Sequence, residues 1–396
     1  LRDQVFARHW QDETWHETLC LIAGLLGKKS VAHVKELIEF LMTQEDEADK
    51  YKNLFVAAQY ARQLRNAQLM GETLIRLCQL LEEVLYDTDI DGLDWSFELE
   101  EHIRINVHAN AISLLAELKP LEESLVWLKN LVCYEDDSSI RYGAIVKLLL
   151  DWKDDPDTKV FLKAMAVNEE DEYVQGTALR QLARYWREDP DILLSLKERA
   201  MNDVSEWVRS PALEELADGW PNDPDTLLIV KDRIQNDESD QVRHTAITAL
   251  ANVWKNDPDT LRLLKLHASK DQDAMVREAA VSGLADGWKV DPDTLLILKQ
   301  AIRDVDWQVR LTAMLELARE WEDDPDVLPM LKTCISQDKN WLVRQSASTE
   351  LIRRWKGDPE VEELVKNFKQ QGTLLENIDD LFEGQGLLDT EIESDE

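Results

Sequence analysis

The sequence has few cysteines, and none of them stands at a spacing that binds metal or suggests a disulfide framework. Cys20, Cys78, Cys133 and Cys334 are isolated in a chain of 396 residues, as is typical of reduced cytoplasmic proteins. The seven histidines are equally dispersed, and no HExxH arrangement occurs. We therefore expect a cytoplasmic protein with no metal site and no cofactor.

Long hydrophobic runs and basic residues are also scarce. No apolar run approaches the roughly 20 residues of a membrane-spanning helix, and no signal peptide is visible. The chain has 45 Lys and Arg against 80 Asp and Glu, a formal net charge of −35. Nucleic-acid backbones and anionic membranes select Lys/Arg-rich surfaces, so the composition argues against both as partners. It fits a basic partner, or simply a well-solvated surface.

The sequence is rich, in contrast, in internal repetition. Seven times a Trp is followed, three residues on, by Asp-Pro and then an acid, and the prolines of these motifs are Pro156, Pro190, Pro224, Pro258, Pro292, Pro325 and Pro359. Successive prolines are 34, 34, 34, 34, 33 and 34 residues apart. A fixed period of this length indicates stacked units that cannot bury their apolar faces alone.

Each repeat is expected to be a helix–turn–helix unit. In the repeat 223–254, Asp223 suits a helix N-cap and Pro224 the first helical position. The first helix is predicted to bury Leu227, Leu228, Val230 and Ile234. The second, from about Gln241, is predicted to bury Val242, Ala246, Leu250, Ala251 and Trp254. We expect all seven repeat tryptophans in the core, where they supply large buried areas.

Most second helices begin with Val-Arg, and an acid lies six residues before the arginine. We call these pairs the Asp–Arg ladder: Asp203 and Arg209, Asp237 and Arg243, Asp271 and Arg277, Asp304 and Arg310, Asp338 and Arg344. One repeat departs from the pattern, with Glu169 at the acid position and Gln175 in place of the arginine. Within a stack, such side chains can form charge-assisted hydrogen bonds from one repeat to the next.

The Asp…Val-Arg spacing and the alanine-rich second helix resemble HEAT repeats of the PBS-lyase-like subtype, over roughly 140–370. Tetratricopeptide units share the period but carry Trp and Gly-Tyr in the first helix, whereas here Trp ends the second. The resemblance implies second helices that line a concave face, with the ladder running through the stack. The predicted fold is all-α: an α-solenoid of about seven 34-residue HEAT helix pairs with an N-terminal, non-repeat helical segment.

Four regions are predicted along the chain. Residues 1–90 form the non-repeat helical segment, 91–150 form degenerate capping repeats, and 151–370 form the solenoid. Residues 371–396 contain nine acids and no Lys or Arg. This composition indicates disorder, with docking onto a groove or partner as the alternative.

The start of the chain has a second resemblance. The string VFARHWQDETWHETLCLIAGLLG resembles the helical segment that follows the nucleotide-binding module in bacterial NACHT-type signalling ATPases. The chain begins at Leu1 rather than Met, so we expect a fragment of a longer protein with an ATPase module upstream. Gly24 to Ser30 lack the glycine spacing of a phosphate loop, and a glycine helix stop followed by a basic turn explains them.

The position two residues before each repeat Trp is left free by the repeat. We call this column the binding ridge: Arg184, Asp218, Asn252, Asp286, Arg319 and Arg353. A basic or donor-rich partner feature is predicted over Asp218 and Asp286, against the alternative of ordinary solvated surface. Further aromatics near the inter-helix turns are expected to pack within their repeats rather than form an exposed edge: Tyr173, Trp207, Trp307 and Trp341.

Three function classes follow. The first is a non-catalytic protein-interaction scaffold, the ligand-sensing or autoinhibitory C-terminal part of a NACHT-type signalling or defence protein. The second is a bilin lyase-type HEAT scaffold acting on phycobiliproteins, which rests on the repeat subtype alone. The third is a conventional enzyme, which we do not expect because the paired carboxylates already serve as helix caps. No feature specifies an oligomeric state.

Overall fold

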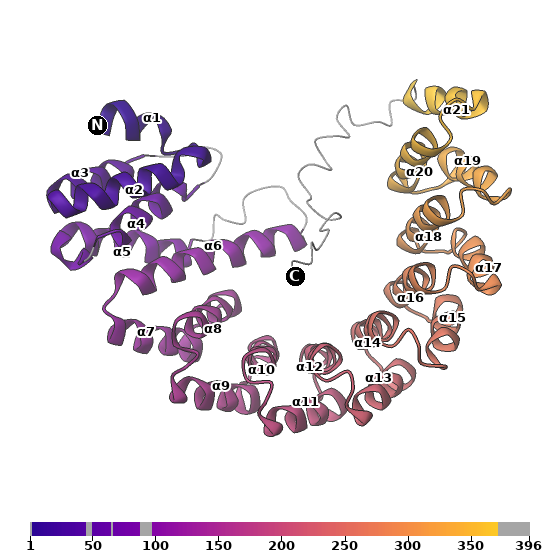
Figure 1. Cartoon of the computed structure of the whole chain (residues 1–396), viewed down its shortest axis with the longest axis horizontal. Coiled ribbons are helices and arrows are strands. Elements are labelled where there is room, and N and C mark those ends of the chain that lie inside the picture. Colours follow the sequence, from indigo (N-terminus) through magenta and orange to yellow (C-terminus); the bar gives the residue numbers. More distant parts are fainter. Residues whose placement is uncertain (1, 45–49, 65, 88–96, 371–396) are drawn as a thin grey trace, which may run out of the picture. The chain divides into compact units, whose positions relative to one another are not determined.

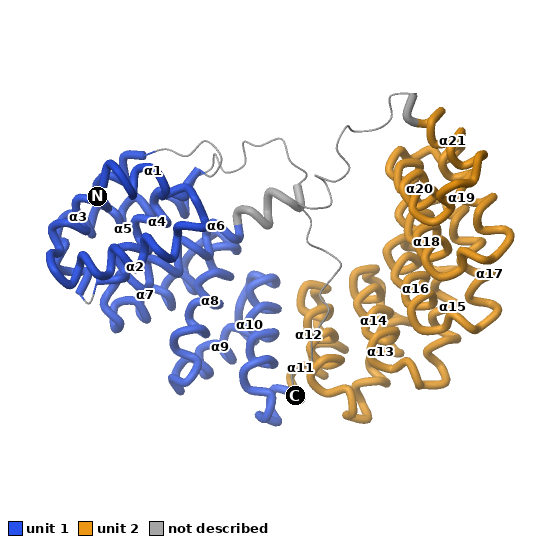
Figure 2. The backbone as a smooth tube through the Cα atoms, turned by 45° about the horizontal axis from the view of Figure 1, so that its top comes forward, with its two compact units in different colours: residues 1–193 blue, residues 194–396 orange. Residues whose placement is uncertain are grey.

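The structure is a computed structural model of the chain, and it describes residues 2–44, 50–64, 66–87 and 97–370 (Figure 1). Over these ranges the regular structure is helical, without strands, and no helix has the length and apolar character needed to cross a membrane. The chain divides into two compact units, residues 1–193 and 194–396, and the division falls within helix α11 (Figure 2). The predicted tail, 371–396, and the start of the capping region, 91–96, lie outside the described residues.

The first unit contains the N-terminal helices and the first repeats. Its elements are η1 (Arg2–Phe6), α1 (Ala7–His9), α2 (Glu13–Lys29), α3 (Val31–Leu41), α4 (Lys52–Arg62), η2 (Ala67–Met70), α5 (Glu72–Leu85), α6 (Phe97–Leu118), α7 (Leu121–Tyr134), α8 (Ser138–Trp152), α9 (Pro156–Asn168), α10 (Glu172–Tyr185) and the start of α11 (Pro190–Asn202). Helices α2 to α5 lie within residues 1–90, the segment that is predicted to be helical.

The prediction of a glycine helix stop followed by a basic turn within Gly24 to Ser30 is wrong. Helix α2 continues through Gly24 and Gly27 and ends at Lys29. A Cβ atom at Gly27 would lie 2.2 Å from Leu64 Cδ2, so glycine here allows a close approach of packed segments. The stretch is thus helical packing surface, and it does not form the loop with which a phosphate site begins.

The second unit alternates first and second helices. After the rest of α11 come α12 (Glu206–Gly219), α13 (Pro224–Asn236), α14 (Asp240–Val253), α15 (Thr260–Lys270), α16 (Ala274–Gly287), α17 (Pro292–Ala301), α18 (Trp307–Glu320), α19 (Val327–Gln337), α20 (Trp341–Arg354) and α21 (Pro359–Gln370). The second helices α12, α14, α16, α18 and α20 line the inner side of this unit's curve, and the first helices lie outside them (Figure 1).

The Asp-Pro-acid motif starts first helices as expected. Asp223 has extended backbone, and its carboxylate accepts a hydrogen bond from the backbone N–H of Asp225 at 3.0 Å. Pro224 is the first helical residue, where its missing N–H costs nothing. In α15 the regular helix begins only at Thr260, although Asp257 still accepts from the N–H of Asp259.

The core prediction holds for the second helix except at Trp254. In the first helix it fails at Leu228, and Leu227 is intermediate in exposure rather than buried. Val242, Ala246, Leu250 and Ala251 are buried. In α13, however, Leu228 is 64% exposed, and Ile229 is buried in its place. The buried positions Thr226, Ile229, Val230 and Ile234 follow the helical period. Leu228 lies two residues from Val230 and therefore points to the opposite side.

The prediction that the repeat tryptophans are fully buried is also wrong, because all seven are intermediate in exposure. Trp186, Trp220, Trp254, Trp288, Trp321 and Trp355 are helix C-caps with non-helical backbone, which takes the indole out of the buried stripe. The Nε1–H of Trp254 donates to Pro221 O at 3.1 Å, and the hydroxyl of Thr260 donates to Trp254 O at 2.8 Å. Trp254 therefore ties together the junction between repeats.

Candidate functional site

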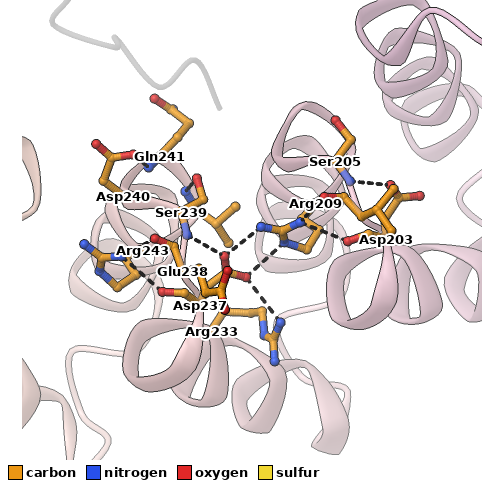
Figure 3. Close-up of polar contacts among 12 residues, drawn as sticks. Asp203, Ser205, Arg209, Arg233, Asp237, Glu238, Ser239, Asp240, Gln241 and Arg243 are labelled. Carbon is orange, nitrogen blue, oxygen red and sulfur yellow. Dashed lines mark hydrogen bonds and ion pairs between the residues drawn. The ribbon is translucent and has the colours of Figure 1, made fainter.

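Four of the ladder arginines, Arg209, Arg243, Arg277 and Arg310, connect their repeat to the next. Figure 3 shows this contact between Arg209 and Asp237. Arg209 donates through Nε to Asp237 Oδ2 at 3.0 Å and through Nη2 to Asp237 Oδ1 at 2.8 Å. Its Nη1 donates at 2.9 Å to the backbone carbonyls of Asp203 and Val204 in its own turn. One guanidinium thus fixes the turn that precedes its helix and binds the following repeat bidentately.

The same geometry recurs along the second unit. Both carboxylate oxygens accept in the pairs Arg243–Asp271 (3.2 and 3.0 Å), Arg277–Asp304 (2.9 and 2.7 Å) and Arg310–Asp338 (2.7 and 2.8 Å). The sequence spacing of six residues therefore corresponds to a backbone contact, while the ion pair joins residues 27 or 28 apart.

Burial makes these pairs energetically important. The side chain of Asp237 is 2% exposed, and its carboxylate also accepts from the N–H of Ser239 at 3.0 Å. Burial alone raises the pKa of Asp271, but hydrogen bonds from His267 and Arg243 outweigh it and hold this pKa well below its usual range. Because breaking one side of a buried pair leaves an uncompensated charge, the ladder fixes the second helices in register.

At the N-terminal end of the ladder the partners differ. The Asp203 carboxylate pairs with Arg199 of its own helix at 2.6 Å. In the first unit, Arg141 forms an equivalent pair with Glu169 and donates from Nε to Val132 O at 2.8 Å. Arg141 therefore occupies a ladder position ahead of the repeat that carries Gln175.

A second ladder, which the sequence reasoning missed, joins the first helices. Lys231 Nζ lies 2.6 Å from Asp257 and 3.0 Å from Asp259, the two acids of the next Asp-Pro-acid motif. We call the set of such lysines the lysine ladder: Lys163, Lys197, Lys231, Lys265, Lys299 and Lys332. Their 33- or 34-residue spacing is visible in the sequence. Helix capping already accounts for the acids of the motif, so their positions in the sequence do not by themselves indicate this second role.

Every residue of the binding ridge is exposed. Asp218, Asn252, Asp286, Arg319 and Arg353 lie near the C-terminal ends of α12, α14, α16, α18 and α20, on consecutive second helices of the second unit. Arg184 has the same place on α10 but belongs to the first unit. The Asp–Arg ladder and the lysine ladder thus connect the repeats, and the ridge side chains on these repeats do not pack in the core.

The ridge charges are partly balanced by neighbours. Asp286 accepts from Lys255 Nζ at 3.3 Å, while Arg319 contacts Glu316 at 2.6 Å and Glu320 at 3.0 Å. Burial raises the pKa of Glu316. Beside Asp286, a Cβ at Gly287 would meet only Lys255 Cδ, at 3.9 Å, so the surface next to this acid is open.

Two of the four additional aromatics contradict the expectation that they pack within their repeats. Trp207 is 55% exposed and Trp341 is 50% exposed, each in the first turn of a second helix. Tyr173 and Trp307 are intermediate in exposure. The ring of Tyr173 lies 6.2 Å from that of Tyr142. In the second unit, the helix starts thus expose Trp207 and Trp341, while the helix ends carry the ridge.

No group of three or more metal-ligating side chains occurs within the described ranges. One hollow of about 560 Å³ lies at an internal ladder position and is lined by Asp237, Arg243, His267 and Asp271, among others. These groups already bond one another across the repeats, so this hollow is part of the ladder packing.

Comparison with known proteins identifies the repeats. Residues 193–285 and 263–353 match a family model described as HEAT repeats, and the fold is an α-solenoid of HEAT type. The chain is similar to the solved structure of YibA from Escherichia coli, at 16% identity over 70% of this chain and 98% of that chain, with a TM-score of 0.46. It is also similar to a microtubule polymerase with a tumor overexpressed gene (TOG) domain array, at 14% identity over 94% of each chain, with a TM-score of 0.30. No curated protein matches the chain.

Proposed function

We propose that this chain is a non-catalytic protein-interaction scaffold that receives a protein partner on the binding ridge. The observation that carries the proposal is the exposed ridge itself, repeated on successive second helices above a packed core. The Asp–Arg and lysine ladders hold neighbouring repeats in register. A surface fixed in this way binds with little loss of conformational entropy.

The partner is expected to present a basic or donor-rich feature to Asp218 and Asp286. Both carboxylates are exposed, and the formal net charge of −35 favours encounter with a positively charged protein. Each acid is followed by a glycine, Gly219 or Gly287, and the open surface at Gly287 leaves room for the partner's side chains beside Asp286. Arg319 and Arg353 lie beyond them, so the partner's charges are expected to change sign along the ridge.

The scaffold is further proposed to be the ligand-sensing or autoinhibitory C-terminal part of a NACHT-type signalling protein. The support is the resemblance of the first sixty residues, whose described part includes helices α2 and α3 and most of α4 and precedes the repeats. The gene sequence upstream of Leu1 tests this placement. A G-x-x-x-x-G-K-[ST] loop between a buried strand and a helix supports it, whereas a start codon close to Leu1 contradicts it.

A charge-reversal experiment tests the ridge. Asp218→Lys with Asp286→Lys should abolish capture of partners that wild-type protein enriches quantitatively from its own cell extract. The matched control is Glu198→Lys with Glu363→Lys, which makes the same charge change on exposed positions of the first helices α11 and α21. Equal circular dichroism and melting temperature verify folding. Capture that survives the ridge reversal, or that is lost equally in the control, refutes the ridge as the binding site.

A further inference from the structure

In Arg344, the last arginine of the Asp–Arg ladder, Nε and Nη2 have no acceptor among the described residues. Arg344 Nη1 donates to Asp338 O at 2.8 Å and to Lys339 O at 3.1 Å, as in the other repeats. In those repeats Nε and Nη2 bind the aspartate 27 or 28 residues later. For Arg344 that position is Gly372, and no carboxylate of the described residues takes its place. The guanidinium therefore offers a two-donor fork that suits a carboxylate.

A hollow lies at this fork. It measures about 320 Å³ and is lined by Arg344, Asp338, Leu364 and Phe368, among others. The hollow at Arg243 occupies the same place in an internal repeat, and there Asp271 contributes the carboxylate. Arg344 is thus placed like the other ladder arginines, but a glycine stands at the sequence position where they have their aspartate partner.

An apolar hollow adjoins the same terminal helix. It measures about 530 Å³, and its lining is mainly apolar, with two lysines and one acid: Ile352, Trp355, Gly357, Val361, Val365, Lys356, Lys366 and Glu362. Ile352 is 43% exposed. Helix α21 is a first helix, and it packs against α19 and α20. In an internal repeat, α16 covers both α14 and α15. The described residues contain no such second helix beyond α21.

The chain that follows has the chemistry to fill both hollows. Leu374, Leu375, Ile378, Leu381 and Phe382 recur at helical spacing, and acids alternate with them. Residues 371–396 contain no Lys or Arg, so they complement Lys356, Lys366 and Arg344. A second helix in register with Trp341 would begin at residue 375, which falls within this stretch.

We propose that residues 374–383 dock on α20 and α21 as a C-terminal cap of the array. Glu376 accepts from the Arg344 fork, close to the end of α21. Leu381 and Phe382 cover Ile352 and Trp355 in the apolar hollow. The segment runs antiparallel to α21, as each second helix runs to its first helix. Capping hides the apolar end that an open repeat array exposes.

Amide hydrogen exchange of the full chain tests the cap. Glu376→Gln should make α21 amides exchange roughly tenfold faster, the effect expected from losing a charged hydrogen bond. Leu381→Ser with Phe382→Ser should give at least the same effect. The control is Glu391→Gln, which removes the same charge farther along the acidic segment.

A double-mutant cycle with Arg344→Gln separates the contact from a general loss of stability. If Glu376 binds Arg344, Glu376→Gln should have little further effect in the Arg344→Gln background. Additive effects, or equal exchange in Glu376→Gln and Glu391→Gln, would overturn the proposal. Protection of α21 that depends on protein concentration would also overturn it, because a second copy would then cover the hollows.

Discussion

Removing one charge from the Asp–Arg ladder should destabilise the second unit strongly. Asp271 is the sharpest position because four donors converge on it: Nε and Nη2 of Arg243, Nδ1 of His267 at 2.9 Å and the N–H of Asp273 at 3.0 Å. Its side chain is 5% exposed. Asp271→Asn keeps the volume and one acceptor oxygen but leaves the Arg243 charge without its partner.

The magnitude follows from the burial of both groups. Breaking a buried pair costs about 3–5 kcal/mol, and we expect about 3 kcal/mol because Arg243 keeps two carbonyl acceptors. A loss of this size makes exchange of the protected amides roughly a hundredfold faster. Native-state hydrogen exchange in α14 to α16 is the appropriate assay, because repeat arrays can unfold in parts. Asp225→Asn, in the exposed part of the lysine ladder, is the matched control.

The effect of Asp271→Asn should also depend on pH. The folded-state pKa of Asp271 lies below its ordinary value of 3.8. The carboxylate therefore stabilises the fold above about pH 4 and loses this contribution as the pH falls through the folded-state pKa. The wild type and Asp271→Asn should converge in acid. If Asp271→Asn changes exchange no more than Asp225→Asn does at pH 7, the ladder does not fix the repeats as argued.

Three further predictions concern packing and charge. Gly283→Ala should cost about 1–3 kcal/mol in urea unfolding, because its Cβ would lie 2.8 Å from Ala251 Cβ, whereas Gly287→Ala in the same helix should be tolerated. Glu316→Gln should raise the melting temperature at pH 7, because burial lifts the Glu316 pKa above 4.5 in the folded state and the charged form is disfavoured there. This gain should shrink near pH 4, and a gain independent of pH would contradict the assignment. Trp254→Phe should cost about 1 kcal/mol through the lost bond to Pro221 O, and a much larger loss would show that the indole is core.

The repeats could be predicted from the sequence because each unit has suitable residues at the positions that a helix pair requires. These are the helix starts and the buried faces. Asp223, Pro224 and Val242 each have a local role, so their positions specify where helices begin and which face is buried. The ladder spacing was equally visible and indicated bonds from one repeat to the next, but it did not specify that Arg243 pairs with Asp271. That pairing depends on how neighbouring repeats stack, which is a tertiary property.

Misassigned positions share a physical cause. Trp254 and Leu228 are apolar but lie at a helix end and on an outer helix face, and composition alone does not distinguish these places from the core. Lys231 was overlooked because its partners, Asp257 and Asp259, already had an explanation as capping residues. The residues of the binding ridge differ from repeat to repeat, so the repeat pattern does not indicate what they bind. The chemistry of the partner must be tested by experiment.

The most direct test of the scaffold account is a hydrogen-exchange footprint of the chain with a partner captured by the wild type and lost on ridge reversal. The account predicts protection at the C-terminal ends of α12, α14 and α16, which carry Asp218, Asn252 and Asp286. The first helices α13 and α15 should exchange as in the free protein. Protection confined to these first helices, with the ridge unchanged, would contradict the account.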